Sequence, residues 1–338
     1  PTDIDEKDYD INMYYACLSA SGKHVMSGVN NEEGLHQVMD MAAMIAGGKD
    51  KLAERPIISV ITSFAISPLK LCTQSTRIMQ EAVRNNIPVA LSSAPMAGST
   101  SPLTMAGTLA QLHAEVLAGI VICQMTNPRA PLLYGGIPGM ANLATMGYCG
   151  GAVECGMMNA AIHQMSRHVK VPNYNSSGLS DAKVPDAQAG YEKAFTSALA
   201  AMGGSNYIHH SAGMLESMLT IAHEQFVIDD EINGSCCKVL KGIEVDEEHL
   251  ALEVIDSVGP GGNYMTAPHT MTHIRSEYFN GNGVTDRKNR DRWTKEGSQD
   301  ARQRALGIAR KLLANKTAYI PDDVDTAIRE KFNILLPK

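Results

Sequence analysis

The chain has 338 residues, of which 44% are hydrophobic and 19% charged, a composition typical of a globular protein and not of a disordered or coiled-coil chain. Its formal net charge of −7 argues against a general nucleic-acid binder, which carries a basic face. We find no run of about 18 apolar residues and expect no membrane span. Seven scattered cysteines, an odd number, argue against a secreted disulfide framework and indicate the cytoplasm.

Short apolar segments, each followed by an amphipathic stretch, recur at nearly even intervals along the first two thirds of the chain. The segments with strand character are 24–28, 57–63, 89–93, 132–135, 172–175 and 206–209. Apolar residues spaced three and four apart predict helices over 32–46, 67–85, 102–124, 152–169 and 186–202. Strands and helices that alternate in this way are typical of successive βα units in a parallel sheet.

Among α/β folds, this pattern favours a β/α barrel of the TIM type, because no phosphate-binding glycine fingerprint follows a strand. The glycine-rich segment 135–139 has the wrong order of glycines and contains Pro138. We count six units where a closed barrel needs eight, and we expect the first two strands to be missing from this chain. Residues 1–211 are assigned to the six units. Residues 212–338 are assigned to C-terminal helices, expected over 214–240 and 246–258, with a charged surface helix over 286–316.

Two pairs of residues that could bind a metal are interpreted as structural. His269 and His273 are four apart, as zinc ligands on a helix are, but Pro268 and nearby glycines indicate a loop and no Glu follows the first His. Cys236 and Cys237 are adjacent in a predicted helix, a spacing that does not suit zinc. We therefore expect buried cysteines that pack in the core and no metal.

Polar and aromatic residues gather at the ends of three consecutive predicted strands, where a barrel places its chemistry. The candidates are Tyr134 and Glu154 on the fourth unit, Tyr174 on the fifth, and Tyr207, His209 and His210 on the sixth. Taken singly, each fits a satisfied polar residue, but their coincidence favours a site. Because adjacent side chains on a strand project to opposite faces, we expect only one of the two histidines to point into the mouth.

One long segment and several shorter ones carry a resemblance to a known family. The long segment is 178–190, GLSDAKVPDAQAG, followed by Glu192 and Lys193. The shorter ones, in the same order, are 55–57, 67–69, 106–109, 114–117, 212–216, 224–225 and 227–229. Together they resemble the trimethylamine methyltransferase family, from near Asp10 to about Asn263.

The resemblance implies a β/α barrel that passes a methyl group from a small methylated amine to the cobalt of a cobalamin (corrinoid) carried by a separate protein. It implies no tightly bound cofactor, and the family's N-terminal stretch includes two strands that this chain lacks. In the family's trimethylamine enzymes, the position of Leu179 holds pyrrolysine. The chain therefore resembles the branch without pyrrolysine, some members of which demethylate quaternary amines such as glycine betaine.

The leucine agrees with the chemistry of the leaving group. A quaternary ammonium is already cationic and leaves as a neutral amine, whereas a tertiary amine must first be activated. The protein then has to orient the substrate and exclude water. We assign Glu154 and His209 to catalysis, with Glu154 supplying negative charge. The proposed substrate-binding residues are Tyr134, Tyr174, Leu179, Tyr207 and His210, with the tyrosine faces holding the cation and a histidine donating to a carboxylate.

The leading hypothesis is thus a cytoplasmic methyltransferase for a betaine-like quaternary amine, expected to be a homo-oligomer and to bind neither nucleic acid nor membrane. Two alternatives stay open. One is a methyltransferase for trimethylamine or another methylated amine, and the other is a noncatalytic amine-binding subunit.

Overall fold

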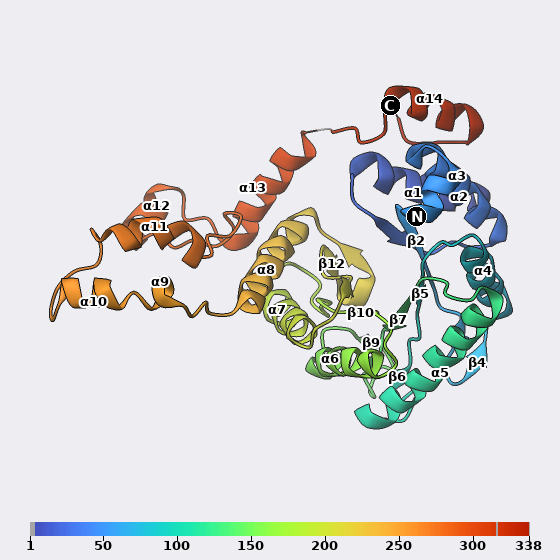
Figure 1. Ribbon diagram of the computed structural model, residues 1–338, viewed down its shortest axis with the longest axis horizontal. Helices are drawn as coiled ribbons and strands as arrows, with labels where there is room; N and C mark the ends of the chain where they lie inside the picture. The colour runs from blue at the N-terminus through green and yellow to red at the C-terminus, as the bar shows by residue number, and fades with distance from the viewer. Residues whose placement is uncertain (1–3, 316, 338) are drawn as a thin grey trace.

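Six parallel strands form the centre of the protein in a computed structural model that describes residues 4–315 and 317–337. They are β1 (Val25–Ser27), β2 (Ile58–Thr62), β5 (Val89–Leu91), β7 (Leu132–Gly136), β10 (Asn173–Ser176) and β11 (Tyr207–His209). Their order in the sheet follows the chain without reversal, which excludes a doubly wound sheet. The sheet curls into part of a barrel, and β1 and β11 are its two edges (Figure 1). The prediction of successive βα units is confirmed.

A ring of helices covers the convex face of this sheet (Figure 1). It comprises α1 (Glu6–Ala20), α2 (Glu32–Ala46), α3 (Lys49–Glu54), α4 (Thr73–Arg84), α5 (Met105–Thr126), α6 (Val153–His168), α7 (Ala187–Met202) and α8 (His223–Lys241). Local signals define their ends: Asn31 and Asp186 cap α2 and α7 with their side chains, and Gly47 ends α2 in a left-handed conformation. The first helix, α1, was not predicted, although Tyr14 within it is completely buried.

The main hydrophobic core lies between the strands and these helices. Strand residues such as Ile58, Val60 and Val89 are fully buried, and they belong to one hydrophobic cluster with helix residues such as Leu35 and Leu112. Strands that are buried on both faces have nearly continuous apolar sequences. For this reason the apolar segments in the sequence predicted the strand positions well.

Short strand pairs follow the C-terminal ends of the barrel strands. They are β3 (Ala65–Ile66) with β4 (Lys70–Leu71), β6 (Met96–Ala97) with β8 (Gly139–Ala141) and β9 (Tyr148–Cys149), and β12 (Met214–Leu215) with β13 (Thr220–Ile221) around the 3₁₀ turn Glu216–Met218. The helices predicted over 67–85 and 214–240 therefore begin later, at Thr73 and His223. Helical spacing alone cannot distinguish a short hairpin from a first helical turn.

The C-terminal third differs most from the prediction. It contains α9 (Glu247–Leu250), α10 (Leu252–Val258), α11 (Pro268–Glu277), α12 (Arg290–Lys295), α13 (Ala301–Leu313) and α14 (Asp322–Lys331). The prediction of a single charged surface helix over 286–316 is wrong. This segment forms two helices, α12 and α13, and Ala305 and Ala309 of α13 are buried against α8. The loop expected around His269 is a helix, because Pro268 occupies the first turn, where its missing N–H costs nothing.

The expectation of buried cysteines at 236 and 237 is wrong. Cys237 is exposed and Cys236 is half-buried, so these are not core cysteines.

Helix α14 packs near the N-terminal helix. There Arg329 donates a hydrogen bond to the hydroxyl of Tyr15 at 2.7 Å. The domain division at residue 211 stays a prediction.

Among the described residues, one helix meets the length and apolar composition of a membrane span, contrary to the expectation from the sequence. It is α5, Met105–Thr126, and in the fold it buries Leu112, Val116 and Cys123 toward the strands. A core helix passes the same test, which makes this weak support for a span.

Candidate active site

Tyr174 crosses the concave face of the sheet. Its strand pairs in register with β7, so that Tyr174 lies opposite Gly135, and a Cβ at Gly135 would stand 2.3 Å from the tyrosine ring. The absence of a side chain at 135 thus leaves room for the ring. The Tyr174 hydroxyl reaches Ser92, beyond the end of β5, at 3.4 Å. Burial raises the pKa of Tyr174, so it is a neutral phenol.

His209 and His210 lie together at the end of β11, contrary to the expectation that they diverge. Their rings stack with centroids 3.5 Å apart, and His209 lies 5.7 Å from the ring of Tyr174. His210 has φ +67°, and this left-handed turn brings its side chain back over its neighbour. Alternation applies only while the backbone stays extended, so the rule failed at the residue where the strand ends.

Both histidines are neutral at physiological pH. Burial lowers the pKa of His209 to about 4 and, with the charge of His209 as a second cause, that of His210 to about 3. His210 Nδ1 bonds Ser176 Oγ at 2.7 Å, whereas the buried Nδ1 of His209 has no hydrogen-bond partner among the described residues. His209 therefore offers an unused polar atom beside the face of Tyr174.

Leu179 lies in the loop that follows β10. Its side chain is only 1% exposed. The residue before it, Gly178, accepts from Lys193 Nζ at 2.7 Å through its carbonyl oxygen. The residue after it, Ser180, donates to Glu192 at 2.7 Å. Two consecutive residues of α7 thus bind both neighbours of Leu179 and fix its position.

A buried ion pair supports the same loop. Lys193 Nζ lies 3.0 Å from Asp229 Oδ2, with the two side chains 1% and 0% exposed. Asp229 also accepts from the backbone N–H of Gly213 and from Gln225, each at 2.7 Å. Burial lowers the pKa of Lys193 and raises that of Asp229, and each charge opposes the effect of burial on the other. The pair therefore joins α7, α8 and the loops after β10 and β11.

Tyr148 is a member of the group that the sequence analysis missed. A Cβ on Gly150 would stand 2.9 Å from the Tyr148 ring and 3.1 Å from Leu179, so these two side chains border one point. Burial is the main cause that raises the pKa of Tyr148, and nearby Tyr174 contributes. Tyr148 lies on the short strand β9 and not on a barrel strand, and for that reason a search of strand ends did not find it.

Three predicted site residues are placed elsewhere or at the margin. Tyr134 points to the convex face, where its hydroxyl bonds His113 of α5 at 2.8 Å, because its neighbour Gly135 occupies the concave side. Glu154 lies in the first turn of α6, and its side chain makes no hydrogen bond or ion pair among the described residues. Tyr207 pairs with Tyr174 on the concave face but is 39% exposed at the beginning of edge strand β11. The group that the structure brings together is thus Tyr148, Tyr174, Leu179, His209 and His210.

The model of the trimethylamine methyltransferase family matches residues 1–334. The chain belongs to this family. The resemblance that the motifs predicted is confirmed, and its relatives are enzymes named as methyltransferases.

Three relatives show the range within the family. A glycine betaine methyltransferase of Desulfitobacterium hafniense is 34% identical over 99% of this chain and 69% of its own. A trimethylamine methyltransferase from another strain of that species is 36% identical over 97% of this chain and 66% of its own. A trimethylamine methyltransferase of Methanosarcina barkeri is 37% identical over 76% of this chain and 51% of its own. The chain thus spans about two thirds of the first two and about half of the third.

A solved structure of dihydropteroate synthase from Coxiella burnetii superposes on 55% of this chain, which corresponds to 87% of the synthase chain. The TM-score is 0.31 and the sequence identity is 14%. That likeness is too low to define the fold, which rests on the strand order described above.

Acidification is expected to destabilise this family member through His210. Its folded pKa is about 3, against 6.5 for an ordinary histidine. Between these values the unfolded chain binds more protons, so this contribution to the free energy of unfolding is complete above pH 6.5 and is lost as pH falls toward 3. The test variant is His210→Asn, because asparagine tolerates the left-handed backbone at this position. In urea unfolding, acidification over that pH range should lower the free energy of unfolding of the variant by on the order of 3 kcal/mol less than that of the wild type.

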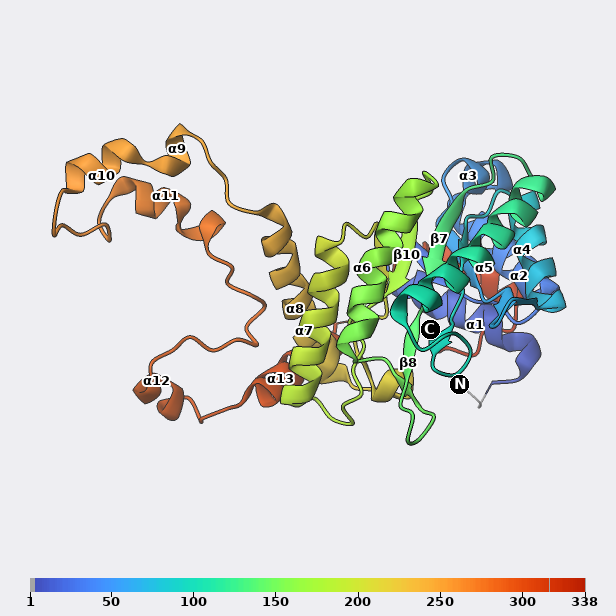
Figure 2. The same cartoon turned by 90° about the horizontal axis from the view of Figure 1, so that it is seen from below.

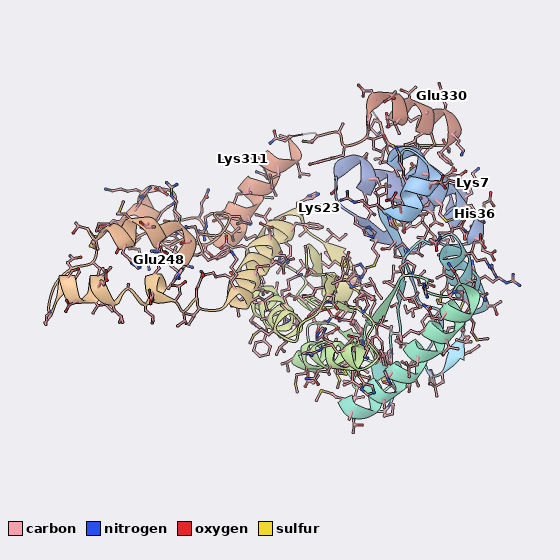
Figure 3. All side chains as sticks on the ribbon, in the orientation of Figure 1. Lys7, Lys23, His36, Glu248, Lys311 and Glu330 are labelled. Carbon is pink, nitrogen blue, oxygen red and sulfur yellow. The ribbon has the colours of Figure 1, made fainter. Side chains whose placement is uncertain are left out.

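The matched control is His36→Asn, which alters an exposed histidine on α2 (Figure 3). Its stability should depend on pH as the wild type's does. A His210→Asn curve parallel to the wild type would contradict the assignment.

Proposed function

We propose that this chain transfers a methyl group from a quaternary amine of the betaine type to the corrinoid of a separate protein. The observation that carries the proposal is a group of uncharged side chains, of which Tyr148 borders Leu179. Tyr148, Tyr174, His209 and His210 are all neutral there at pH 7, because burial disfavours their charged forms. Such surroundings present aromatic faces to a cation, and the nearby charge of Lys193 is paired with Asp229.

The identity of residue 179 supports a quaternary substrate. When the C–N bond of a quaternary ammonium breaks, nitrogen keeps the electron pair and leaves as a neutral tertiary amine. The methyl group leaves without its bonding electrons, and the acceptor supplies a new pair. No proton has to reach nitrogen, so an apolar side chain at this position is sufficient. Leu179 then excludes water from the reacting groups.

The carboxylate of a betaine needs hydrogen-bond donors, and His209 is the proposed one. A neutral imidazole carries one N–H, and the buried Nδ1 of His209 has no described partner to compete for it. Tyr174, whose ring lies 5.7 Å away, would face the ammonium at the other end of the substrate. The corrinoid supplies the nucleophile for the methyl group when its protein docks at the C-terminal ends of the strands.

The test is a methyl-transfer assay with glycine betaine, carnitine and trimethylamine as substrates and reduced free cobalamin as acceptor. The change in the visible spectrum of cobalamin reports the transfer. We expect turnover with at least one quaternary amine and none with trimethylamine. Turnover of trimethylamine alone would overturn the substrate assignment. Binding of a quaternary amine in calorimetry without any transfer would favour a noncatalytic binding subunit.

A further inference from the structure

Residues 242–283, which we call the arm, extend away from the barrel in both views and carry α9, α10 and α11 (Figures 1 and 2). The structure describes all of these residues, and none of them is buried. At the base of the arm, Glu231 of α8 accepts a hydrogen bond from the backbone N–H of Asn282 at 3.1 Å. Three short helices without a core do not hold one another in place by the hydrophobic effect, so some other interaction has to order them.

The two longer helices of the arm each present an apolar face to solvent. Leu252 and Ile255 are three residues apart on α10, and Met271 and Ile274 are three residues apart on α11. Residues at this spacing lie on the same face of a helix. All four side chains are between 50% and 67% exposed. Exposed apolar faces of this kind mark surfaces that bind another protein.

The arm is also strongly acidic. Residues 243–267 contain six acidic side chains and neither lysine nor arginine, so that their net charge is −6 with the histidine neutral. Glu247, Glu253 and Asp256 form no ion pair among the described residues. A partner that covers the apolar faces of the arm therefore has to bring positive charge.

The stretch that follows the arm carries the opposite charge. Residues 287–311, which we call the basic segment, cover α12 and most of α13 and contain nine basic and three acidic side chains, a net charge of +6. Lys295, Arg310 and Lys311 form no ion pair among the described residues. The ion pairs that other basic residues of the segment do form are with Asp286, Glu296 and Glu224, none of which belongs to the arm.

The arm and the basic segment of one chain are directed apart. In Figure 2 the helices α9, α10 and α11 lie on one side and α12 on the other. Figure 3 likewise places Glu248 of the arm away from Lys311 of α13. The basic segment of one chain is thus open to the arm of another.

We propose that the arm is a dimerisation element, which docks on the basic segment of a second copy of this chain while the arm of that copy docks on the first. The charges of −6 and +6 select a second copy as the occupant, because this chain itself carries the complement of its arm. The exchange is reciprocal, as two-fold symmetry requires. Docking buries the apolar faces of α10 and α11 and supplies the order that a missing core does not. The surface lies outside the group around Leu179, and the proposal is independent of the proposed function.

The experiment measures the mass of the full chain by sedimentation equilibrium at low ionic strength. We expect a dimer with twice the 36.3 kDa of one chain, and we expect added salt to dissociate it, because salt screens exposed charges. The arm variant, Glu247→Lys/Glu253→Lys/Asp256→Lys, replaces three of the six acidic side chains by three basic ones and brings the charge of residues 243–267 from −6 to 0. It should weaken association at least about tenfold.

A charge exchange identifies the two surfaces that meet. The segment variant, Lys295→Glu/Arg310→Glu/Lys311→Glu, leaves six basic and six acidic side chains in the basic segment and should weaken association as much as the arm variant does. An equimolar mixture of the two variants should dimerise again, because each altered arm then faces an altered segment and each unaltered arm an unaltered segment. Proteolytic cleavage of the arm should be faster in either variant alone than in the wild type or the mixture.

Lys7→Glu/Lys70→Glu/Lys170→Glu is the matched control. It changes the net charge of the chain as much as the segment variant does, at exposed lysines outside the arm and the segment. Lys7 lies on the side of the molecule opposite the arm (Figure 3). The control should dimerise like the wild type. A monomeric wild type, which would leave the arm to a different protein, would overturn the proposal, as would a mixture of the arm and segment variants that stays monomeric.

Discussion

Lys193→Met is expected to lower the free energy of unfolding by roughly 3–5 kcal/mol, as breaking a buried ion pair does. The reason is Asp229, which would stay ionised or take up a proton at a site where its side chain is 0% exposed. The same change removes the donor to the carbonyl oxygen of Gly178, so the loop that carries Leu179 loses one of the hydrogen bonds that hold it to α7. Urea unfolding measures the first effect and kcat/KM for methyl transfer the second.

Lys183→Met is the matched control. Lys183 lies in the same loop but is exposed, and it donates only to the carbonyl oxygen of Asp181. Its replacement should change stability by less than about 0.5 kcal/mol. In the double variant Lys193→Met/Asp229→Leu, both charges are absent and part of the lost stability should return. A Lys193→Met protein as stable as the wild type would contradict the role of the pair.

Leu179→Ala is expected to cost about 2–5 kcal/mol of stability, the usual range for a fully buried leucine, and to lower kcat/KM without changing the reaction. The cavity that it leaves beside Tyr148 is expected to admit water and to loosen the position of the substrate. Stability comes from urea unfolding, and the rate comes from the cobalamin assay with the best quaternary amine.

Two further variants separate the role of Leu179 from a general loss of packing. Val184→Ala alters an apolar residue of the same loop that is 46% exposed, and it should change neither stability nor rate appreciably. Leu179→Met keeps the volume and should retain most of both. A Leu179→Ala enzyme with unchanged kcat/KM would show that residue 179 does not border the reacting groups.

The local pattern predicted the strands and most helices of the barrel because each satisfies its own periodicity. Ile58–Thr62 is an apolar run closed on both faces, and α7 has Asp186 at its beginning and apolar residues at helical spacing. The site was predicted less completely. Tyr174 and His209 were found from their strand ends, but Tyr134 was placed on the wrong face, since a shift of one residue inverts the direction of a side chain in a strand.

What the sequence determined by itself is therefore local or shared with relatives: the order of the βα units, the family, and the leucine at position 179. The tertiary structure decided which side chains meet. Tyr148 joins Leu179 only because β9 folds back across the strand ends. Lys193 and Asp229 are 36 residues apart and pair only because α7 packs on α8. Periodicity records the neighbours along a helix or strand, whereas contacts between elements depend on register and loop paths, which no local pattern encodes.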